Sequence, residues 1–175
     1  MKILGLLRHA KSDWGQSDKR DFDRGLNDRG RCGAQVIGKH IRAHGVDWDT
    51  LVASPAERVK QTLAAALPAF VPQWDERLYL AGTDTIMDVI REKGGDGESL
   101  LVSGHNPGLG DMLFELVAPK NENALYDEAK VKFPTAAYAV FELDIEEWSD
   151  LRDGCGVLVH FARPRDLDPE LGPEY

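Results

Sequence analysis

Short apolar runs alternate with helix-like apolar stripes along the first two thirds of the chain. Residues 3–7 are apolar and are followed by Arg8 and His9, a pattern typical of a buried strand that ends in polar residues. Further strands are predicted at 50–53, 74–80 and 99–103. Helices are predicted after each strand, beginning near Asn27, Ser54, Thr83 or Asp84, and after Asn106-Pro107-Gly108.

The helix starts carry capping signals. Asn27 is the expected N-cap of the first helix, and Gly45 is expected to stop it. Ser54 is the expected N-cap of the second, with Pro55 at its first position and Glu57 closing a capping box.

The last third of the chain has a different pattern. Residues 119–132 are polar and mixed in charge, so we predict a surface loop there, with at most a helical turn. Residues 135–143 and 156–162 are predicted strands joined by an acidic connection, which favours an antiparallel pair. Residues 164–175 are rich in proline and acid and are expected to form a loosely ordered tail.

The repeated strand–helix alternation predicts an α/β fold. We expect a three-layer α/β/α sandwich with a mostly parallel central sheet and a C-terminal antiparallel strand pair. The length of 175 residues suits one domain, placed at 1–163, followed by the tail.

The formal net charge of −9 argues against a nucleic-acid partner. Cys32 and Cys155 form no CxxC motif, so neither a disulfide framework nor a zinc site is predicted. No apolar run has the length of a signal peptide or a membrane span, and we expect a cytoplasmic protein with no membrane partner.

Unusual residues follow three of the predicted strands. Arg8 and His9 follow the first, Ser54 and the helix holding Arg58 follow the second, and His105 follows the fourth. Because the carboxyl ends of parallel strands meet at one edge of a sheet, two arginines and two histidines are expected to share a cleft. Arginine forks match phosphoryl oxygens, and histidine can act as nucleophile or as acid and base. Each residue alone would more often be structural, and the joint placement carries the interpretation.

These motifs resemble the histidine phosphatase superfamily, which includes the phosphoglycerate mutases. The similar segments are Leu7-Arg8-His9-Ala10-Lys11-Ser12, Ser54-Pro55-Ala56-Glu57-Arg58-Val59-Lys60-Gln61-Thr62 and Gly104-His105-Asn106-Pro107. Lys11-Ser12-Asp13-Trp14 and the stretch from Arg20 to Gly30 are closer to one branch, the SixA-type phosphohistidine phosphatases. The resemblance covers roughly residues 1–118.

The resemblance implies roles for the matched residues. His9 would attack phosphorus and become phosphorylated, Arg8, Arg58 and His105 would hold the phosphoryl oxygens, and water would then release phosphate. Ser12 and Asn106, in the same motifs, would also contact the substrate. No metal and no cofactor is implied. The expected partner is a phosphorylated protein, with a histidine phosphotransfer domain as one example, or a small phosphate ester.

The chain departs from the family pattern at three places, and the first of them bears on the substrate. Mutase-like members carry a glutamic general acid after the third strand, whereas this chain has Leu78-Tyr79-Leu80-Ala81-Gly82 there, with Glu76 before it. Gly15 and Gly25 replace an asparagine and a proline of the usual pattern. An imidazole leaves easily once protonated, so a missing acid favours phosphohistidine over a sugar phosphate. Asp13 and Asp21 are the remaining candidates for a proton donor, although loop bracing is the more ordinary role of each.

Other interpretations stay open from the sequence. The same pocket suits a phosphomonoesterase for a small phosphorylated metabolite, and a non-catalytic phosphoprotein-binding module is the alternative of another class. Retention of His9, both arginines and His105 speaks against the binding module. His40 and His44 have a zinc-compatible i, i+4 spacing but lack a third ligand, so they are assigned to a solvated helix face.

Overall fold

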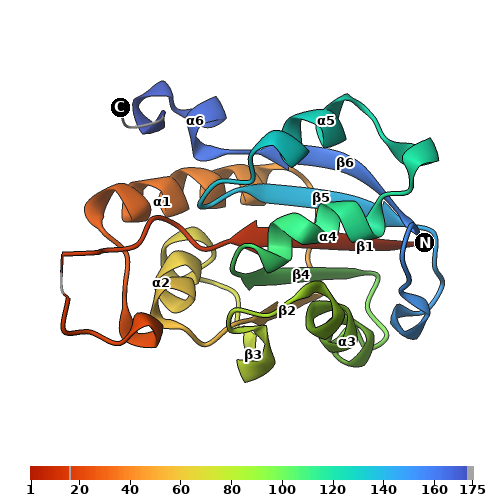
Figure 1. Ribbon diagram of the computed structural model, residues 1–175, viewed down its shortest axis with the longest axis horizontal. Helices are drawn as coiled ribbons and strands as arrows, with labels where there is room; N and C mark the ends of the chain where they lie inside the picture. The colour runs from red at the N-terminus through yellow and green to blue at the C-terminus, as the bar shows by residue number, and fades with distance from the viewer. Residues whose placement is uncertain (16, 173–175) are drawn as a thin grey trace.

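A six-stranded mixed sheet forms the centre of the molecule, in the order β3-β2-β4-β1-β5-β6 (Figure 1). The structure is a computed structural model that describes residues 1–15 and 17–172. The strands are β1 Lys2–Arg8, β2 Thr50–Ala53, β3 Gln73–Trp74, β4 Ser99–Gly104, β5 Tyr138–Leu143 and β6 Gly156–Ala162. Strands β3, β2, β4 and β1 pair in parallel, and β5 pairs antiparallel with both β1 and β6. This confirms the predicted α/β fold with an antiparallel C-terminal pair.

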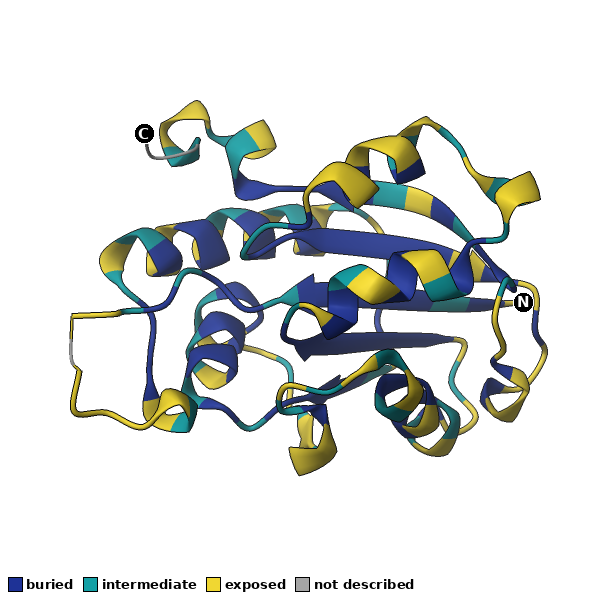
Figure 2. Ribbon diagram, viewed as in Figure 1, coloured by how far each residue is buried: buried dark blue, intermediate teal, exposed yellow. Residues whose placement is uncertain are grey.

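Helices cover both faces of the sheet and bury two apolar clusters. α1 Asp28–Ala43 and α2 Glu57–Ala66 lie on one face, and α3 Thr83–Lys93, α4 Gly108–Leu116 and α5 Ala124–Val131 lie on the other. Alternate residues of β1 serve the two sides: Leu4 and Leu6 join the cluster under α3–α5, and Leu7 joins the cluster under α1 and α2. Figure 2 shows the strands buried and the outer helix faces exposed.

The third predicted strand is largely wrong. Only Gln73–Trp74 pair with β2, and Glu76–Leu78 then form a 3-10 helix. The side chain of Asp75 caps this turn by accepting a hydrogen bond from the Arg77 backbone N–H. Apolar residues such as Leu78 pack into the core from this turn. The sequence pattern therefore resembled that of a buried strand, although the backbone forms none.

The segment predicted as a loop at 119–132 holds more helix than expected. Pro119–Asn121 form a 3-10 turn, and α5 begins after Asn123, whose side chain accepts from the Tyr126 backbone N–H. Tyr126 and Ala129 bury one face of α5 against the core, while its polar residues face outward. That narrow apolar stripe is why the sequence looked polar throughout.

The tail expected from residue 164 also begins with ordered structure. α6 Pro164–Leu167 packs against α1, and a 3-10 turn follows at Pro169–Leu171. Arg29 on α1 donates to the backbone carbonyls of Glu170 and Gly172. Residues 173–175 of the expected tail lie outside the described part of the chain.

The predicted caps are confirmed in part. Asn27 caps α1 by accepting from the Gly30 backbone N–H at 2.7 Å. Ser54 is not the N-cap of α2, which begins two residues later than predicted, with Ala56 at that position. The predicted capping box is therefore absent from α2, and Glu57 instead accepts a hydrogen bond from Gln61. Among the described residues, no helix has both the length and the apolar character needed to cross a membrane.

Candidate active site

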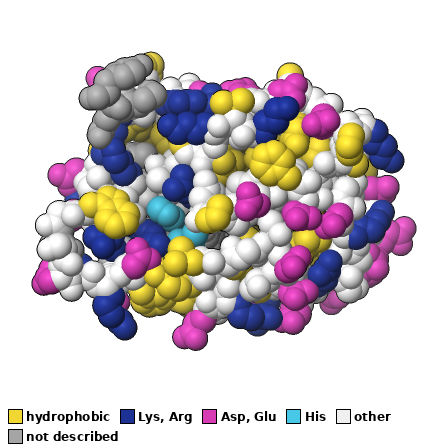
Figure 3. Space-filling model, in the orientation of Figure 1, with side chains coloured by type: hydrophobic (Ala, Val, Ile, Leu, Met, Phe, Trp, Pro, Cys, Tyr) yellow, Lys and Arg dark blue, Asp and Glu magenta, His cyan; other side chains and the backbone are white. Residues whose placement is uncertain are grey.

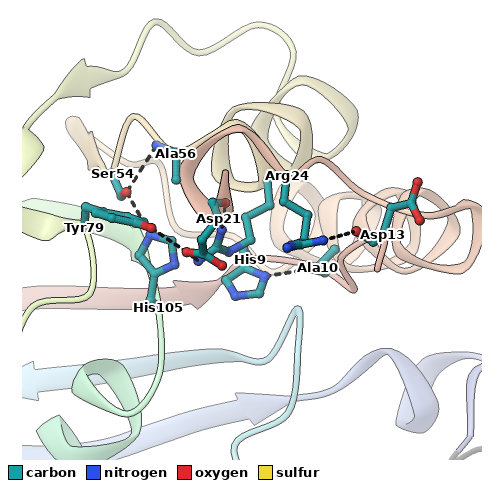
Figure 4. Close-up of polar contacts among 10 residues, drawn as sticks. His9, Ala10, Asp13, Asp21, Arg24, Ser54, Ala56, Tyr79 and His105 are labelled. Atoms are coloured by element: carbon teal, nitrogen blue, oxygen red, sulfur yellow. Dashed lines mark hydrogen bonds and ion pairs between the residues drawn. The ribbon is translucent and has the colours of Figure 1, made fainter. Parts of the chain in front are cut away.

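The sheet register brings the predicted site residues to one edge. Arg8 is the last residue of β1 and pairs with Gly104 at the end of β4. His9 and His105 therefore come directly after two neighbouring strands. Their ring centroids lie 5.3 Å apart. β2 ends beside β4 and leads through Ser54 into α2, whose Arg58 contacts Asp21. Figure 4 shows His9, His105, Ser54 and Asp21 together at this edge. The expected meeting of strand ends is therefore present.

His9 is held in one tautomer. Its Nδ1 lies 2.7 Å from the backbone carbonyl of Ala10, and because a carbonyl can only accept, Nδ1 carries the proton. Nε2 is left with a free lone pair. The residue is 8% exposed, and this burial lowers the pKa of the ring to about 4. The bond to Ala10 opposes the shift, while the charges of Arg8 and Arg58 add to it. His9 is thus neutral at physiological pH.

The two arginines are anchored by different parts of the chain. Arg8 donates from Nη1 to the backbone carbonyl of Phe133, in the loop between α5 and β5, at 3.1 Å. Arg58, which is 5% exposed, donates from Nη1 to the Asp21 backbone carbonyl at 2.8 Å and from Nη2 to its carboxylate at 3.1 Å. Each guanidinium keeps further N–H groups for an anion, since it has five donors.

His105 is oriented by Ser54, a contact that the capping interpretation missed. The His105 Nε2 lies 2.8 Å from Ser54 Oγ, and both residues are buried. The same hydroxyl accepts from the Ala56 backbone N–H at 3.3 Å. The hydroxyl can either donate to Nε2 or accept from it, so the contact fixes the orientation of the His105 ring. Burial lowers the pKa of His105 to about 3, with the charges of His9 and Arg58 adding.

The carboxylate nearest the histidines belongs to Asp21, in the 3-10 helix Asp21–Asp23. It accepts a hydrogen bond from the Tyr79 hydroxyl and pairs with Arg58. The Tyr79 hydrogen bond, with the charge of Arg58, lowers the pKa of Asp21 below its usual range. Asp21 is therefore ionised, and it acts here as a brace. Asp13, the other candidate donor, accepts from the Gly15 backbone N–H and is not among the described residues lining the cavity.

Two polar residues of α2 form hydrogen bonds to the segment that follows β1 and so hold it beside the site. Thr62 Oγ1 accepts from the Ala10 backbone N–H at 2.9 Å and donates to the Arg58 carbonyl at 2.7 Å. Gln61 Oε1 accepts from the Leu26 backbone N–H at 2.8 Å. Both belong to the second motif, but their positions gave no sign of these partners.

A cavity of about 740 Å³ opens in front of His9. Arg8, His9, Ser12, Asp21 and Arg58 line it, which brings four of the predicted residues into one space. His105 and Asn106 are not among its described lining residues. Asn106 uses both ends of its amide within the protein, donating to the Phe133 carbonyl and accepting from the Gly110 backbone N–H.

The described residues, 1–15 and 17–172, hold no group of three or more side chains placed to bind a metal ion. His40 and His44 do meet a third histidine, His160 on β6, and the His40 and His160 Nε2 atoms lie 2.7 Å apart. Adjacent rings are nearly parallel, with angles of 19° and 26° between His160 and the two helix histidines. This stack is a hydrogen-bonded surface cluster beside Tyr138.

The motifs and the fold agree with the comparisons to known proteins. A family model for the histidine phosphatase superfamily, branch 1, matches residues 4–79. The chain is 34% identical over 160 residues to an uncharacterised protein of Mycobacterium tuberculosis, covering 91% of this chain and all of that one. The chain belongs to the histidine phosphatase superfamily, in its SixA-type branch. Membership supports a phosphatase hydrolase.

Solved structures share the whole fold. A provisionally assigned phosphohistidine phosphatase SixA from Nakamurella multipartitia superposes with a TM-score of 0.82 at 30% identity, covering 93% of this chain and 96% of that one. Its counterpart from Agrobacterium tumefaciens gives 0.76 at 28% identity, covering 93% and 98%. A protein histidine phosphatase SixA complexed with tungstate gives 0.74 at 19% identity, covering 95% and 99%, a likeness of fold.

Proposed function

We propose that this protein hydrolyses phosphohistidine on a partner protein through a phosphorylated His9. The observation that carries the proposal is the state of His9: a buried, neutral ring with Nδ1–H donated to Ala10 and Nε2 free, beside Arg8 and Arg58. No step requires a metal, because the arginines neutralise the phosphoryl oxygens.

In the first step the His9 Nε2 lone pair forms a bond to phosphorus as the substrate P–N bond breaks. The departing imidazole takes the electron pair of that bond. If its other ring nitrogen is protonated, it leaves as neutral imidazole and needs no proton at the breaking bond. The phosphorylated His9 ring is cationic, and its Nδ1–H stays on the Ala10 carbonyl, which stabilises the charge.

In the second step water attacks phosphorus on the face opposite His9. The P–Nε2 bond breaks, its electron pair returns to Nε2, and the water proton goes to the released phosphate. His9 is again neutral with a proton on Nδ1. The two steps are chemically alike, since each breaks a P–N bond to an imidazole.

The position and state of Asp21 support the choice of leaving group. An alkoxide needs a proton donor at the departing oxygen. Asp21 is the one carboxylate among the described residues lining the cavity, and its Tyr79 and Arg58 contacts keep it ionised. Leu80 lines the cavity in the stretch where mutase-like members carry their acid. This arrangement fits a leaving group that brings its own proton.

The test compares the wild type, His9→Ala and His160→Ala on a histidine-phosphorylated protein and on a panel of phosphate monoesters. We expect phosphohistidine hydrolysis by the wild type, retention in His160→Ala, and a loss of about 10³-fold or more in His9→Ala. Quenching during turnover with alkaline detergent, which preserves the acid-labile P–N bond, should trap phosphate on His9. Turnover confined to one small ester would instead assign a metabolite phosphomonoesterase, and binding without turnover would assign a phosphoprotein-binding module.

A further inference from the structure

Cations are concentrated in the cavity out of proportion to the rest of the chain. Seven of the 21 lysines and arginines line it, against one of the 30 aspartates and glutamates, Asp21, counted over the described residues. Figure 3 shows Lys and Arg side chains gathered around the histidines, whereas acidic side chains predominate over the opposite half of the same face. A protein with a net charge of −9 therefore presents one positive recess.

Two of these cations belong to the phosphoryl site, and two others are held by contacts within the protein. Arg8 and Arg58 flank His9. Arg163 pairs with Glu128 and Asp166, and Arg29 donates to backbone carbonyls. The charge of Arg163 and the N–H donors of Arg29 are thus engaged in contacts that hold the wall of the cavity in place.

Lys132 and Arg165 are different. Lys132 follows α5 directly and is exposed, and Arg165 lies half-buried on α6. Within residues 1–15 and 17–172, neither has an assigned side-chain hydrogen bond or an ion pair within 4 Å, although Asp166 lies close enough to feel the charge of Arg165. Both line the same cavity as His9, on the wall made by the C-terminal part of the chain.

The cavity is also larger than a phosphoryl group requires. About 740 Å³ falls within the range of roughly 300–1,000 Å³ of sites that bind much larger ligands. Pro134, Pro164 and Trp14 contribute apolar walls between the charged ends. When the phosphohistidine side chain of a partner protein reaches His9, the side chains of Lys132 and Arg165 would face the surface of that partner around the phosphohistidine.

We propose that Lys132 and Arg165 form a second anion-binding subsite, which recognises acidic side chains flanking the phosphohistidine on a partner protein. This inference rests on the proposed function. Its physical basis is charge complementarity at the rim of the cavity. Such complementarity orients the partner protein as it approaches and favours acidic partners over others. Acidic side chains predominate over the other half of the face shown in Figure 3, so an acidic partner is attracted to the recess rather than to that half.

The test uses two chemically phosphorylated histidine peptides that differ only in their flanking residues, glutamate in one and glutamine in the other. The variants are Lys132→Glu with Arg165→Glu, the neutral pair Lys132→Gln with Arg165→Gln, and Lys120→Glu as a matched control outside the cavity. Lys120 is exposed on the 3-10 turn Pro119–Asn121. The measured quantity is kcat/KM at low and high salt.

We expect the wild type to prefer the glutamate peptide by about tenfold at low salt, with the preference shrinking at high salt. The neutral pair should abolish the preference, the glutamate pair should reverse it, and Lys120→Glu should retain it. An equal rate on both peptides in the wild type, or equal losses on both in the variants, would overturn the subsite. Absence of any His9-dependent hydrolysis of either peptide would instead overturn the proposed function.

Discussion

His9 and His105 leave neighbouring parallel strands and face each other with ring centroids 5.3 Å apart. Burial lowers the pKa of His9 to about 4 and that of His105 to about 3. Two adjacent rings are thus uncharged at neutral pH, and the positive charge that acts on them comes from Arg8 and Arg58. In the proposed function, a neutral His9 attacks phosphorus and a neutral His105 donates its one ring N–H to the phosphoryl group.

The titration of His9 follows from this burial. An unperturbed imidazole gains its proton near pH 6.5, whereas His9 should stay neutral until the pH falls through about 4. We expect the NMR chemical shift of its Cε1–H, assigned by comparison with His9→Ala, to stay nearly constant from pH 8 to pH 5. A midpoint near 6.5 would show that the ring is solvated and charged in mild acid.

Ser54 should act as a positioning residue for His105. Removal of its hydroxyl leaves the buried Nε2 without a partner, and we expect Ser54→Ala to lose about 1–3 kcal/mol of unfolding free energy and about tenfold in kcat. Ser54→Thr, which keeps the hydroxyl, should restore the rate.

Ser99→Ala is the matched control for Ser54→Ala. Ser99 is also buried and its hydroxyl donates to the Asp47 carbonyl, at the end of β4 remote from His105. The Ser99→Ala variant should lose a similar amount of unfolding free energy, while its kcat stays unchanged. Equal kcat losses in the two alanine variants would mean that the effect of Ser54 is merely structural.

Asp21 is expected to brace Arg58 rather than donate a proton. In Asp21→Asn the hydrogen-bonding shape is nearly kept, so phosphohistidine turnover should fall by no more than about tenfold. Asp23→Asn, in the same 3-10 helix but outside the described cavity lining, is the control. A loss of about 10²-fold or more in kcat confined to Asp21→Asn would identify a general acid.

Two glycines of α1 should respond oppositely to alanine. A Cβ on Gly38 would lie 2.3 Å from the Ala66 backbone oxygen, so Gly38→Ala should separate α1 from α2 and cost about 1–3 kcal/mol. A Cβ on Gly33 would meet only Pro164, at an ordinary 3.7 Å, and should stabilise the helix by about 0.5–1 kcal/mol. Urea unfolding of both variants checks this. Equal effects would show that the helix contact is looser than described.

Much of the site could be predicted because sheet topology does the positioning. Arg8, His9 and His105 directly follow or end parallel strands, and Arg58 lies in the first turn of α2, so their meeting depended only on strand order. No side-chain contact had to be foreseen for these four.

The contacts that hold the site together could not be predicted in the same way. The partnership of Asp21 with Tyr79 joins residues 58 positions apart, and the Ser54 hydroxyl reaches His105 across 51 positions. No periodicity marks such pairs, because each depends on side-chain rotamers set by packing. The C-terminal wall of the cavity was missed for another reason: a proline-rich acidic stretch suggested disorder, although Pro164 is buried against α1.

The most direct test of the account measures leaving-group dependence on one scaffold. A peptide phosphorylated on histidine is compared with the same peptide carrying phosphoserine at that position, with the wild type and His9→Ala. Because the described residues lining the cavity offer no protonated acid to a departing alkoxide, we predict a His9-dependent kcat/KM about 10²–10⁴-fold higher for the phosphohistidine peptide. Equal His9-dependent turnover of the two peptides would contradict the account.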